Sequence, residues 1–563
     1  MFIDVKLLLV HDLIPLYFWG IEMEESFDYI IVGAGSAGCV LANKLSENEG
    51  SSVLLIEAGG KDTNLFIHMP SGYSQIVPKS NKQNYGFETE PESNTAGRKL
   101  YWPRGRGWGG SSSINAMIYT RGHSSDYDHW RQLGNQGWSY DDVLPYFKRA
   151  ENYEGDGDEG YHGKSGPLNV KKSTRDDDIL LDKFVEAGSQ AGFPLTNDFN
   201  GKQQEGFSRY EHTIKGSKRF SSARAYLHPA LNRKNLHTKT NITVNKVIFE
   251  NKKAIGVEYF YKGIKVFCRG NKEIILSSGA VNSPQILMRS GIGDSEEIKK
   301  HGIEVTNELK GVGKNLQDHF AVVSQFQCTQ PVTLHRSASL FGTMLAGIKY
   351  LVTGTGDASN PPCVGGAFIK SRPEKEIPDI QIHYVSIAMQ DVHGRAGVPQ
   401  EHGFSNLVYL CRPQSRGHIT LKSSNPNDAP LMFPNYFSAE QDLIDTRNGL
   451  RQAHRVFMQP AFDEYRGEEL KPGKGINLNN DDELDAWIRE TGETLYHPVG
   501  TCKMGIDELS VTNEHGQVHG VRSLRVVDAS LMPSLIAGNT NAPTIMMAEK
   551  ISDHINGKAF LSN

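Results

Sequence analysis

The sequence has few cysteines, no long hydrophobic run and no strong charge of one sign. Its six cysteines form no CxxC pair and are scattered along the chain, at Cys39, Cys268, Cys328, Cys363, Cys411 and Cys502. This spacing argues against a disulfide framework or a zinc site and favours reduced, mostly buried thiols. The formal net charge of −5 over 563 residues provides no basic field. We therefore expect no resident metal and no nucleic-acid partner.

The first 22 residues are apolar but interrupted. Residues 7–10 and 13–21 are rich in large apolar side chains, yet His11, Asp12 and Pro15 break the run. The segment is too short and too broken for a membrane-spanning helix, and it lacks the basic start and small-residue cleavage site of a signal peptide. We expect an N-terminal extension over residues 1–25, with Met23 as the natural start. A membrane-surface anchor is the alternative.

The most informative stretch covers residues 27–57. An apolar β-type run at 27–32 leads into Gly33-Ala34-Gly35-Ser36-Ala37-Gly38 and a helix-like segment, and a second apolar run ends in Glu57, 19 residues after Gly38. Gly33 permits a tight turn, Gly35 lets a pyrophosphate approach the backbone, and Gly38 lets the helix pack closely on the strands. The helix N-terminus favours phosphate, and Glu57 can accept hydrogen bonds from a ribose. This frame predicts dinucleotide binding.

Three later stretches also contain residues suited to binding a dinucleotide. Residues 102–116 combine glycines and serines with large Trp, Arg and Ile side chains. Such a composition is expected where a flat polar group lies close to the backbone. A strand-like run followed by a second glycine-rich turn covers 273–293. Near the end, a β run closes at Asp528, and Pro543 lies where a helix is expected to start.

Through these four stretches, the chain resembles the glucose-methanol-choline oxidoreductases, which are FAD enzymes. The resemblance covers nearly all of residues 26–556 and is greatest to the choline-dehydrogenase-like branch, which includes dehydrogenases of aliphatic alcohols and oxidases of furan and benzyl alcohols. It rests on the Gly33–Gly38 turn, residues 103–122, residues 279–293, and the pair of segments 497–501 and 539–543.

The resemblance implies an α/β fold (α+β overall), with a Rossmann-like FAD-binding domain and a substrate domain whose antiparallel sheet is flanked by helices. We expect the FAD-binding domain to be assembled from residues 26–160, 211–320 and 495–563. Residues 161–210 would form a cap segment and residues 321–494 the substrate-binding domain. The alternating runs at 380–384 and 405–410 agree with such a sheet.

The resemblance also implies the residues that hold FAD. The ADP half would contact Gly33, Gly35, Ser36, Ala37, Gly38, Glu57, Ala58 and Val244. The pyrophosphate and flavin would contact Gly109, Gly110, Ser111, Asn115, Ala116, Met117, Asp528, Ala529, Asn541, Pro543 and Thr544. Some relatives carry a histidine that bonds covalently to the flavin, and the matching residue here is Ile114. FAD is therefore expected to bind without a covalent bond.

His497 and Asn541 are the predicted catalytic residues. Oxidation of an alcohol requires removal of its hydroxyl proton, and a neutral imidazole suits that task. Many relatives have histidine where this chain has Asn541. An amide can donate a hydrogen bond to a developing alkoxide, but it cannot accept the proton. We therefore expect His497 to act as the base. The flavin would accept the hydride at N5. Asn541 could instead cap a helix, and His319 is expected to be structural.

The predicted function is FAD-dependent oxidation of a primary alcohol to the aldehyde, with electrons passing to a quinone or another carrier. An oxidase that uses O₂ and releases H₂O₂ is the first alternative, and a lyase or photodecarboxylase on the same scaffold is another. The partners would be a small alcohol and an electron acceptor. The expected location is the cytoplasm, with peripheral association at the inner face of the membrane as an alternative.

Overall fold

The computed structural model describes residues 22–173, 175, 177–361, 363–397 and 401–561. Most of the predicted N-terminal extension, residues 1–21, lies outside the described residues. The first strand, β1 (Glu22–Val32), begins ahead of the apolar run at Phe27, because its backbone pairs with β15 (Ile264–Leu276) from Glu22 onward. Residues 22–25 therefore belong to the first sheet.

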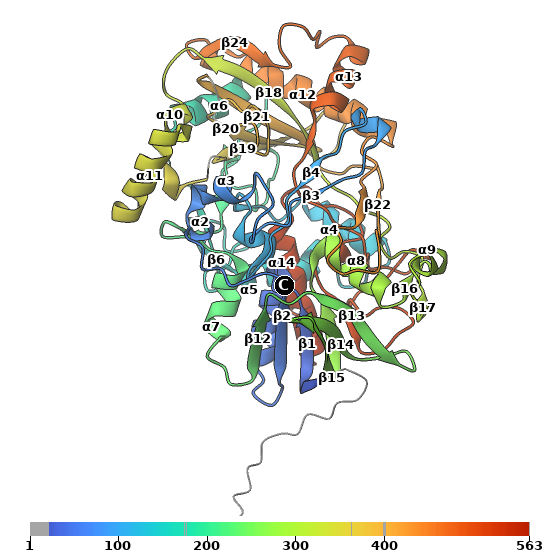
Figure 1. Cartoon of the computed structure of the whole chain (residues 1–563). Helices are drawn as coiled ribbons and strands as arrows, with labels where there is room; N and C mark the ends of the chain where they lie inside the picture. The colour runs from blue at the N-terminus through green and yellow to red at the C-terminus, as the bar shows by residue number, and fades with distance from the viewer. Residues whose placement is uncertain (1–21, 174, 176, 362, 398–400, 562–563) are drawn as a thin grey trace, which may run out of the picture.

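A seven-stranded mixed sheet forms the lower half of the molecule in Figure 1. Its order is β12-β2-β1-β15-β14-β13, and β26 pairs with β15. The central pairs are parallel, whereas β13, β14 and β15 form an antiparallel meander. Its remaining strands are β2 (Val53–Glu57), β12 (Leu236–Thr240), β13 (Val244–Glu250), β14 (Lys253–Tyr261) and β26 (Leu524–Val526).

The central strands are buried on both faces. Ile31 and Leu55 belong to one hydrophobic cluster, while their neighbours Ile30 and Leu54 belong to another on the opposite face. This alternation follows from the two-residue period of a strand. The first face is covered by α1 (Ser36–Ser46), α5 (Tyr140–Ala150) and α14 (Asn541–Ile555), and the second by the meander and α8 (Gly279–Arg289).

A second seven-stranded sheet, entirely antiparallel, forms the upper half (Figure 1). Its order is β24-β18-β21-β20-β19-β8, and β25 pairs with β18. Helices α6 (Ile179–Gln190) and α12 (Glu440–Phe457) cover one face, and the other face looks toward the first sheet. The strands are β8 (Gly206–Arg209), β18 (Phe320–Cys328), β19 (Gly365–Ile369), β20 (Ile380–Val385), β21 (Gly403–Leu410), β24 (Arg466–Lys471) and β25 (Glu493–Thr494).

The two sheets confirm the predicted α/β class with its additional antiparallel sheet. Shorter elements surround the space between them: α2 (Leu65–His68), the 3₁₀ turns η3 (Gly110–Ser113) and η5 (Asp357–Ser359), α10 (His335–Ala338) and α11 (Leu340–Thr353). Helix α11 projects from the left of the molecule in Figure 1. Within the described part of the chain, no helix combines the length and apolar character needed to cross a bilayer.

Candidate active site

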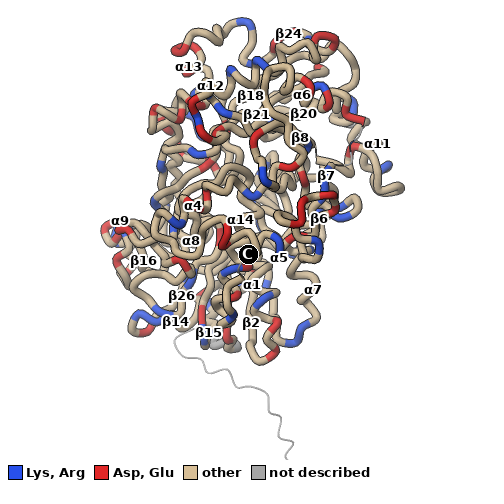
Figure 2. The backbone as a smooth tube through the Cα atoms, turned by 180° about the vertical axis from the view of Figure 1, so that it is seen from behind, with Lys and Arg blue, Asp and Glu red and all other residues tan. Residues whose placement is uncertain are grey.

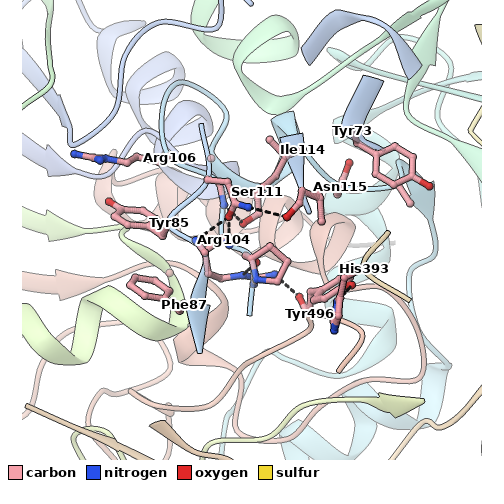
Figure 3. Close-up of a pocket in the computed structure, with 18 of the residues that line it drawn as sticks. Tyr73, Tyr85, Phe87, Arg104, Arg106, Ser111, Ile114, Asn115, His393 and Tyr496 are labelled. Atoms are coloured by element: carbon pink, nitrogen blue, oxygen red, sulfur yellow. Dashed lines mark hydrogen bonds between the residues drawn. The ribbon is translucent and has the colours of Figure 1, made fainter. Parts of the chain in front are cut away.

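A cavity of about 1410 Å³ runs between the two sheets. Val32, Ile56 and Val244 line it from the first sheet, and His383 and Leu407 line it from the second. Pockets for one drug-sized ligand span roughly 300–1,000 Å³, so this cavity leaves room for a dinucleotide and a substrate together. Figure 3 shows part of its wall.

Three helices begin at the wall of the cavity. The N-cap residues of α1, α8 and α14 are Gly35, Ser278 and Thr540, and all three line the cavity. A helix N-terminus carries free N–H groups and a partial positive charge, which favour a bound phosphate or another anion. A pyrophosphate therefore fits this end of the cavity.

Two glycines of the first turn are required by close backbone contacts. Gly33 has a φ of +103°, and a Cβ on it would lie 2.5 Å from the carbonyl oxygen of Ser277. A Cβ on Gly38 would lie 1.9 Å from the carbonyl oxygen of Gly33. The first glycine therefore lets the chain turn after β1, and Gly38 lets α1 pack directly on that turn.

Glu57 joins three loops at the end of β2. Its carboxylate accepts hydrogen bonds from the backbone N–H groups of Ala34 at 2.8 Å, Gly59 at 2.8 Å and Gly107 at 2.9 Å. Burial raises the pKa of Glu57, while the three N–H groups act in the opposite direction. The residue predicted to bind a ribose thus also fixes the relative positions of both glycine-rich loops.

The glycine- and serine-rich stretch folds over the first turn. A Cβ on Gly110 would lie 2.8 Å from the Cα of Gly35, so the two loops touch through backbone. Asn115 accepts a hydrogen bond from Arg219 Nη1 at 2.7 Å. Burial lowers the pKa of this arginine to about 9. Ile114 lines the cavity and packs with an apolar cluster.

Asp528 orients the second glycine-rich turn. Its carboxylate accepts hydrogen bonds from the Gly279 N–H at 2.9 Å, from the Ser283 hydroxyl at 2.5 Å and from the Ser530 N–H at 2.8 Å. Burial raises the pKa of Asp528. The carboxylate holds the start of α8 at the cavity wall, where Ala529 also lies.

The cavity wall includes most of the residues predicted from the sequence to hold the cofactor. These are Gly33, Gly35, Ser36, Ala37, Glu57, Ala58, Gly110, Ser111, Asn115, Ala116, Met117, Val244, Asp528, Ala529, Asn541 and Thr544. Gly38, Gly109 and Pro543 are not on the wall. Gly38 packs beneath the turn, Gly109 donates its N–H to the Ala34 carbonyl at 2.8 Å, and Pro543 is buried in the first turn of α14.

His497 reaches the same cavity from a strained bend. The preceding residue, Tyr496, has a φ of +66°, which is unusual for a non-glycine residue. The backbone N–H of His497 donates to Asp318 Oδ1 at 2.7 Å, and Arg104 donates to the Tyr496 carbonyl. Figure 3 shows Arg104 and Tyr496 joined in this way beside His393. The bend therefore holds the imidazole in a defined position.

Hydrogen bonds determine which nitrogen of His497 carries its proton. His319 Nε2 lies 2.9 Å from the carbonyl oxygen of Cys411, so this nitrogen must be the donor. Neutral His319 then has its lone pair on Nδ1, which lies 2.8 Å from His497 Nδ1. His497 must therefore donate from Nδ1, and its Nε2 carries the lone pair. The sequence predicted a structural role for His319, and in the structure it makes two buried hydrogen bonds, one of them to His497.

Asn539, and not Asn541, makes the hydrogen bond to His497. Asn539 Nδ2 lies 3.2 Å from His497 Nε2. Asn541 lines the cavity and accepts a hydrogen bond from the Ser36 hydroxyl at 2.8 Å. The N-cap of α14 is Thr540, so the alternative interpretation of Asn541 as a helix cap is wrong. Asn539 was missed, although it lies in the same short motif.

Four imidazoles gather on this side of the cavity. His212, His319, His383 and His497 are all buried. Burial lowers the pKa of His212 and His319 to about 4 and that of His383 to about 3. It also lowers the pKa of His497 well below its ordinary value, helped by His319, His383 and Arg104. His497 is thus held neutral, as a base must be.

The aromatic residues of the second sheet divide between its faces. Tyr409 lies beside His497, with ring centroids 6.2 Å apart. Tyr384 and Phe404 belong to the cluster under α6 and α12, on the face away from the cavity. This division follows from strand alternation, which sequence alone could not assign to a face.

The GMC oxidoreductase family models match residues 27–321 and 413–548. A Pseudomonas fluorescens protein named oxygen-dependent choline dehydrogenase is 45% identical over 541 residues, covering 95% of this chain and 94% of the relative. Human mitochondrial choline dehydrogenase is 44% identical over 551 residues, covering 96% and 92%. The crystal structure of pyridoxine 4-oxidase from Mesorbium loti superposes with a TM-score of 0.84 at 29% identity, covering 95% of this chain and all of that one.

Proposed function

Because the chain belongs to the GMC oxidoreductase family, whose members are FAD-dependent enzymes acting on CH–OH groups, we propose that it oxidises a primary alcohol to the aldehyde with His497 as the base. The single observation that supports this role is the chain of hydrogen bonds from Cys411 through His319 to His497. It leaves the lone pair on His497 Nε2, at the wall of the cavity.

The residues of the chain have separable tasks in this proposal. His497 Nε2 takes the hydroxyl proton, and its Nδ1–H continues to donate to His319 while the ring is charged. Asn541 donates to the developing alkoxide and holds its oxygen against Nε2. The Asn539 amide, which donates to Nε2 at 3.2 Å in the structure, gives up that position to the alcohol hydroxyl and turns its N–H to the alkoxide. Bound FAD supplies the acceptor for the hydride that leaves the carbon. The buried wall excludes water from this step.

FAD is the cofactor of the chain, and the cavity fits it: three helix N-termini meet at one end, and tight glycine contacts bring backbone to the wall. We propose that Gly35, Ser36 and Ala37 hold the pyrophosphate and that Glu57 and Val244 contact the ADP half. The loop of Gly110, Ser111, Asn115, Ala116 and Met117, together with Asp528, Ala529 and Thr544, would contact the flavin half. Ile114 offers no nucleophilic atom, which supports binding without a covalent bond.

We propose an uncharged primary alcohol as the substrate. Choline carries a permanent cation, which a protein ordinarily binds with carboxylates and aromatic faces. The neighbours that lower the pKa of His497 are His319, His383 and Arg104, and none of them is acidic. The carboxylate beside it, that of Asp318, already accepts from the His497 backbone N–H at 2.7 Å. Asp391, which lines the cavity, accepts hydrogen bonds from the backbone N–H groups of His393 at 2.8 Å and Arg395 at 3.0 Å. The relatives named choline dehydrogenase make choline the competing substrate.

We propose a quinone or another carrier as the electron acceptor, and a cytoplasmic location. The thiols of Cys39, Cys328, Cys363, Cys411 and Cys502 are buried and form no disulfide, which supports a compartment where thiols stay reduced. Oxygen is the second candidate acceptor, favoured by the name of the Pseudomonas fluorescens relative.

The test is anaerobic flavin bleaching with a panel of short aliphatic alcohols, benzyl alcohol and choline. We expect bleaching by at least one uncharged alcohol, and we expect His497→Ala to retain FAD but slow the bleaching by about 100- to 10,000-fold. Unchanged bleaching in the FAD-loaded variant would remove His497 as the base. Preference for choline over every uncharged alcohol would overturn the substrate proposal alone. Repeating turnover in air and under argon with a dye identifies the acceptor, because peroxide formation is expected only from an oxidase.

A further inference from the structure

Helix α11 exposes an apolar face to solvent. Six large side chains on it are each about half exposed or more: Phe341, Met344, Leu345, Ile348, Leu351 and Val352. Their spacing of three and four residues places them along one side of the helix. We call these six side chains the outer face of α11.

The opposite side of the same helix is attached to the protein. Tyr350 is 5% exposed and packs with Ala346, Met69 and Ala358. An ordinary surface helix turns its apolar side inward and its polar side outward, whereas α11 is apolar on both sides. Scattered apolar residues on a surface need no explanation, but a contiguous set on one projecting helix marks an interaction site.

A neighbouring element also exposes an apolar side chain. Phe66 on α2 is 42% exposed, and Met69, directly after α2, packs against α11. Both helices lie on the left side of the molecule in Figure 1, where α11 projects beyond α2. The projecting helix therefore carries its outer face away from the body of the protein.

Charges around this surface are mainly positive, although the whole chain is acidic. Lys349 is the single charged residue within α11, and Arg336 lies on α10 directly before it. Lys218 lies on β11 (Lys218–Arg219), which contacts α2. The nearby Asp357 is engaged by the Ser337 hydroxyl and lies 3.6 Å from Arg175. Figure 2 shows α11 from behind as a largely uncharged segment.

The cavity that holds His497 opens beside this helix. Thr343, Ala346 and Gly347 on the inner side of α11 line it, as does Phe66 on α2. A molecule leaving or entering along these residues passes directly from the cavity to the apolar surface. The surface is thus placed where a substrate or electron acceptor would be delivered.

We propose that α11 and α2 dock onto an anionic lipid bilayer, with the outer face of α11 in the interface and the cavity mouth facing the lipid. An apolar helix face flanked by lysine and arginine is the chemistry that binds such a surface. A helix of this length, about 21 Å, lies in the interface and cannot span the hydrocarbon core of about 30 Å. The delivery role rests on the proposed alcohol oxidation and on a membrane-dissolved quinone as acceptor; the docking itself does not.

The test uses the full-length FAD-loaded protein and co-sedimentation with vesicles of phosphatidylcholine and phosphatidylglycerol in a 3:1 ratio. The test variant is Phe341→Gln/Ile348→Gln/Leu351→Gln, none of whose positions lines the cavity. The matched control is Phe260→Gln/Ile264→Gln/Ile506→Gln, which removes side chains of comparable exposure from other parts of the surface. We expect the test variant to lose at least tenfold in vesicle partitioning and the control to partition like the wild type.

Two activity assays separate this proposal from the proposed function. With a water-soluble dye, the test variant is expected to oxidise alcohol like the wild type, whereas turnover with a long-chain quinone held in the vesicles is expected to fall with its binding. Equal vesicle binding by the wild type and the test variant, or no binding by either, would overturn the docking proposal. So would a wild-type dimer that the test variant converts to monomer without any vesicle affinity, because a second copy would then cover the outer face. Failure of alcohol oxidation in every assay would instead remove the proposed function.

Discussion

Replacing His319 by leucine removes the acceptor of the His497 Nδ1–H and tests the assigned tautomer. In the wild type the two nitrogens are 2.8 Å apart in a fully buried setting. In the proposed reaction His497 takes the proton of the alcohol, and this hydrogen bond then involves a charged group and is worth about 1.5–3 kcal/mol. Its loss is expected to slow flavin reduction by roughly 10- to 100-fold, since 1.36 kcal/mol corresponds to a factor of ten.

The assay is anaerobic stopped-flow reduction of the flavin at saturating and limiting alcohol. The loss is expected in the limiting rate of reduction and not in the apparent affinity for alcohol, because His319 does not line the cavity. His319→Gln is the conservative variant: its amide can donate to the Cys411 carbonyl and accept from His497. We expect it to recover part of the rate.

His212→Leu is the matched control for this substitution. His212 is equally buried and lies 2.9 Å from a backbone carbonyl, that of Cys363, but no hydrogen bond joins it to His497. A general packing effect would lower the reduction rate in both leucine variants. If FAD-loaded His319→Leu reduced its flavin at the wild-type rate, the tautomer and the role of His319 would both be refuted.

Three further predictions concern stability and the cofactor. The folded pKa of His212, about 4, lies below its unfolded value of about 6.5, so its contribution to stability is complete above pH 6.5 and is lost as the pH falls toward 4. Acidification from pH 7.5 to 4.5 is therefore expected to cost the wild type about 2.5 kcal/mol more than His212→Leu, measured by urea unfolding at each pH; parallel curves for the two proteins would contradict this. Glu57→Ala is expected to weaken FAD binding at least tenfold, measured by flavin fluorescence during titration, because three buried N–H groups lose their acceptor; retention of wild-type affinity would show that the loops hold without it. Acid precipitation of the wild type is expected to leave all yellow colour in the supernatant, since Ile114 cannot form a bond to the flavin, and colour in the pellet would show a covalent link.

Much of the dinucleotide end of the protein was predictable from residues close together in the sequence. The run from Gly33 to Glu57 folds locally into strand, turn, helix and strand, and its glycines meet backbone contacts that a side chain would block. Asp528 and the start of α14 were also found, because each follows a recognisable strand or turn signal. The second role of Glu57, joining the two glycine-rich loops, was not predictable, because one of its three donors is Gly107, 50 residues further along the chain.

The hydrogen-bond partners of the proposed base, His497, depended on the tertiary structure. The sequence motif alone singled out His497, but the partner of its Nδ1 lies 178 positions away on another segment. Likewise, the alternating runs at 380–384 and 405–410 do not show which side of the sheet faces the cavity, and only the folded strands β20 and β21 place Tyr409 beside His497 and Tyr384 on the opposite face.

The sequence by itself determined the cofactor class, the fold class and the identity of the candidate base, because these depend on local backbone geometry and on residue types within short motifs. Only the tertiary structure decided which nitrogen of His497 carries the lone pair, that Asn539 donates to this nitrogen, and that α11 turns six apolar side chains outward. These hydrogen bonds and exposures depend on contacts between segments far apart in the chain, and a local sequence pattern does not predict which segments come into contact.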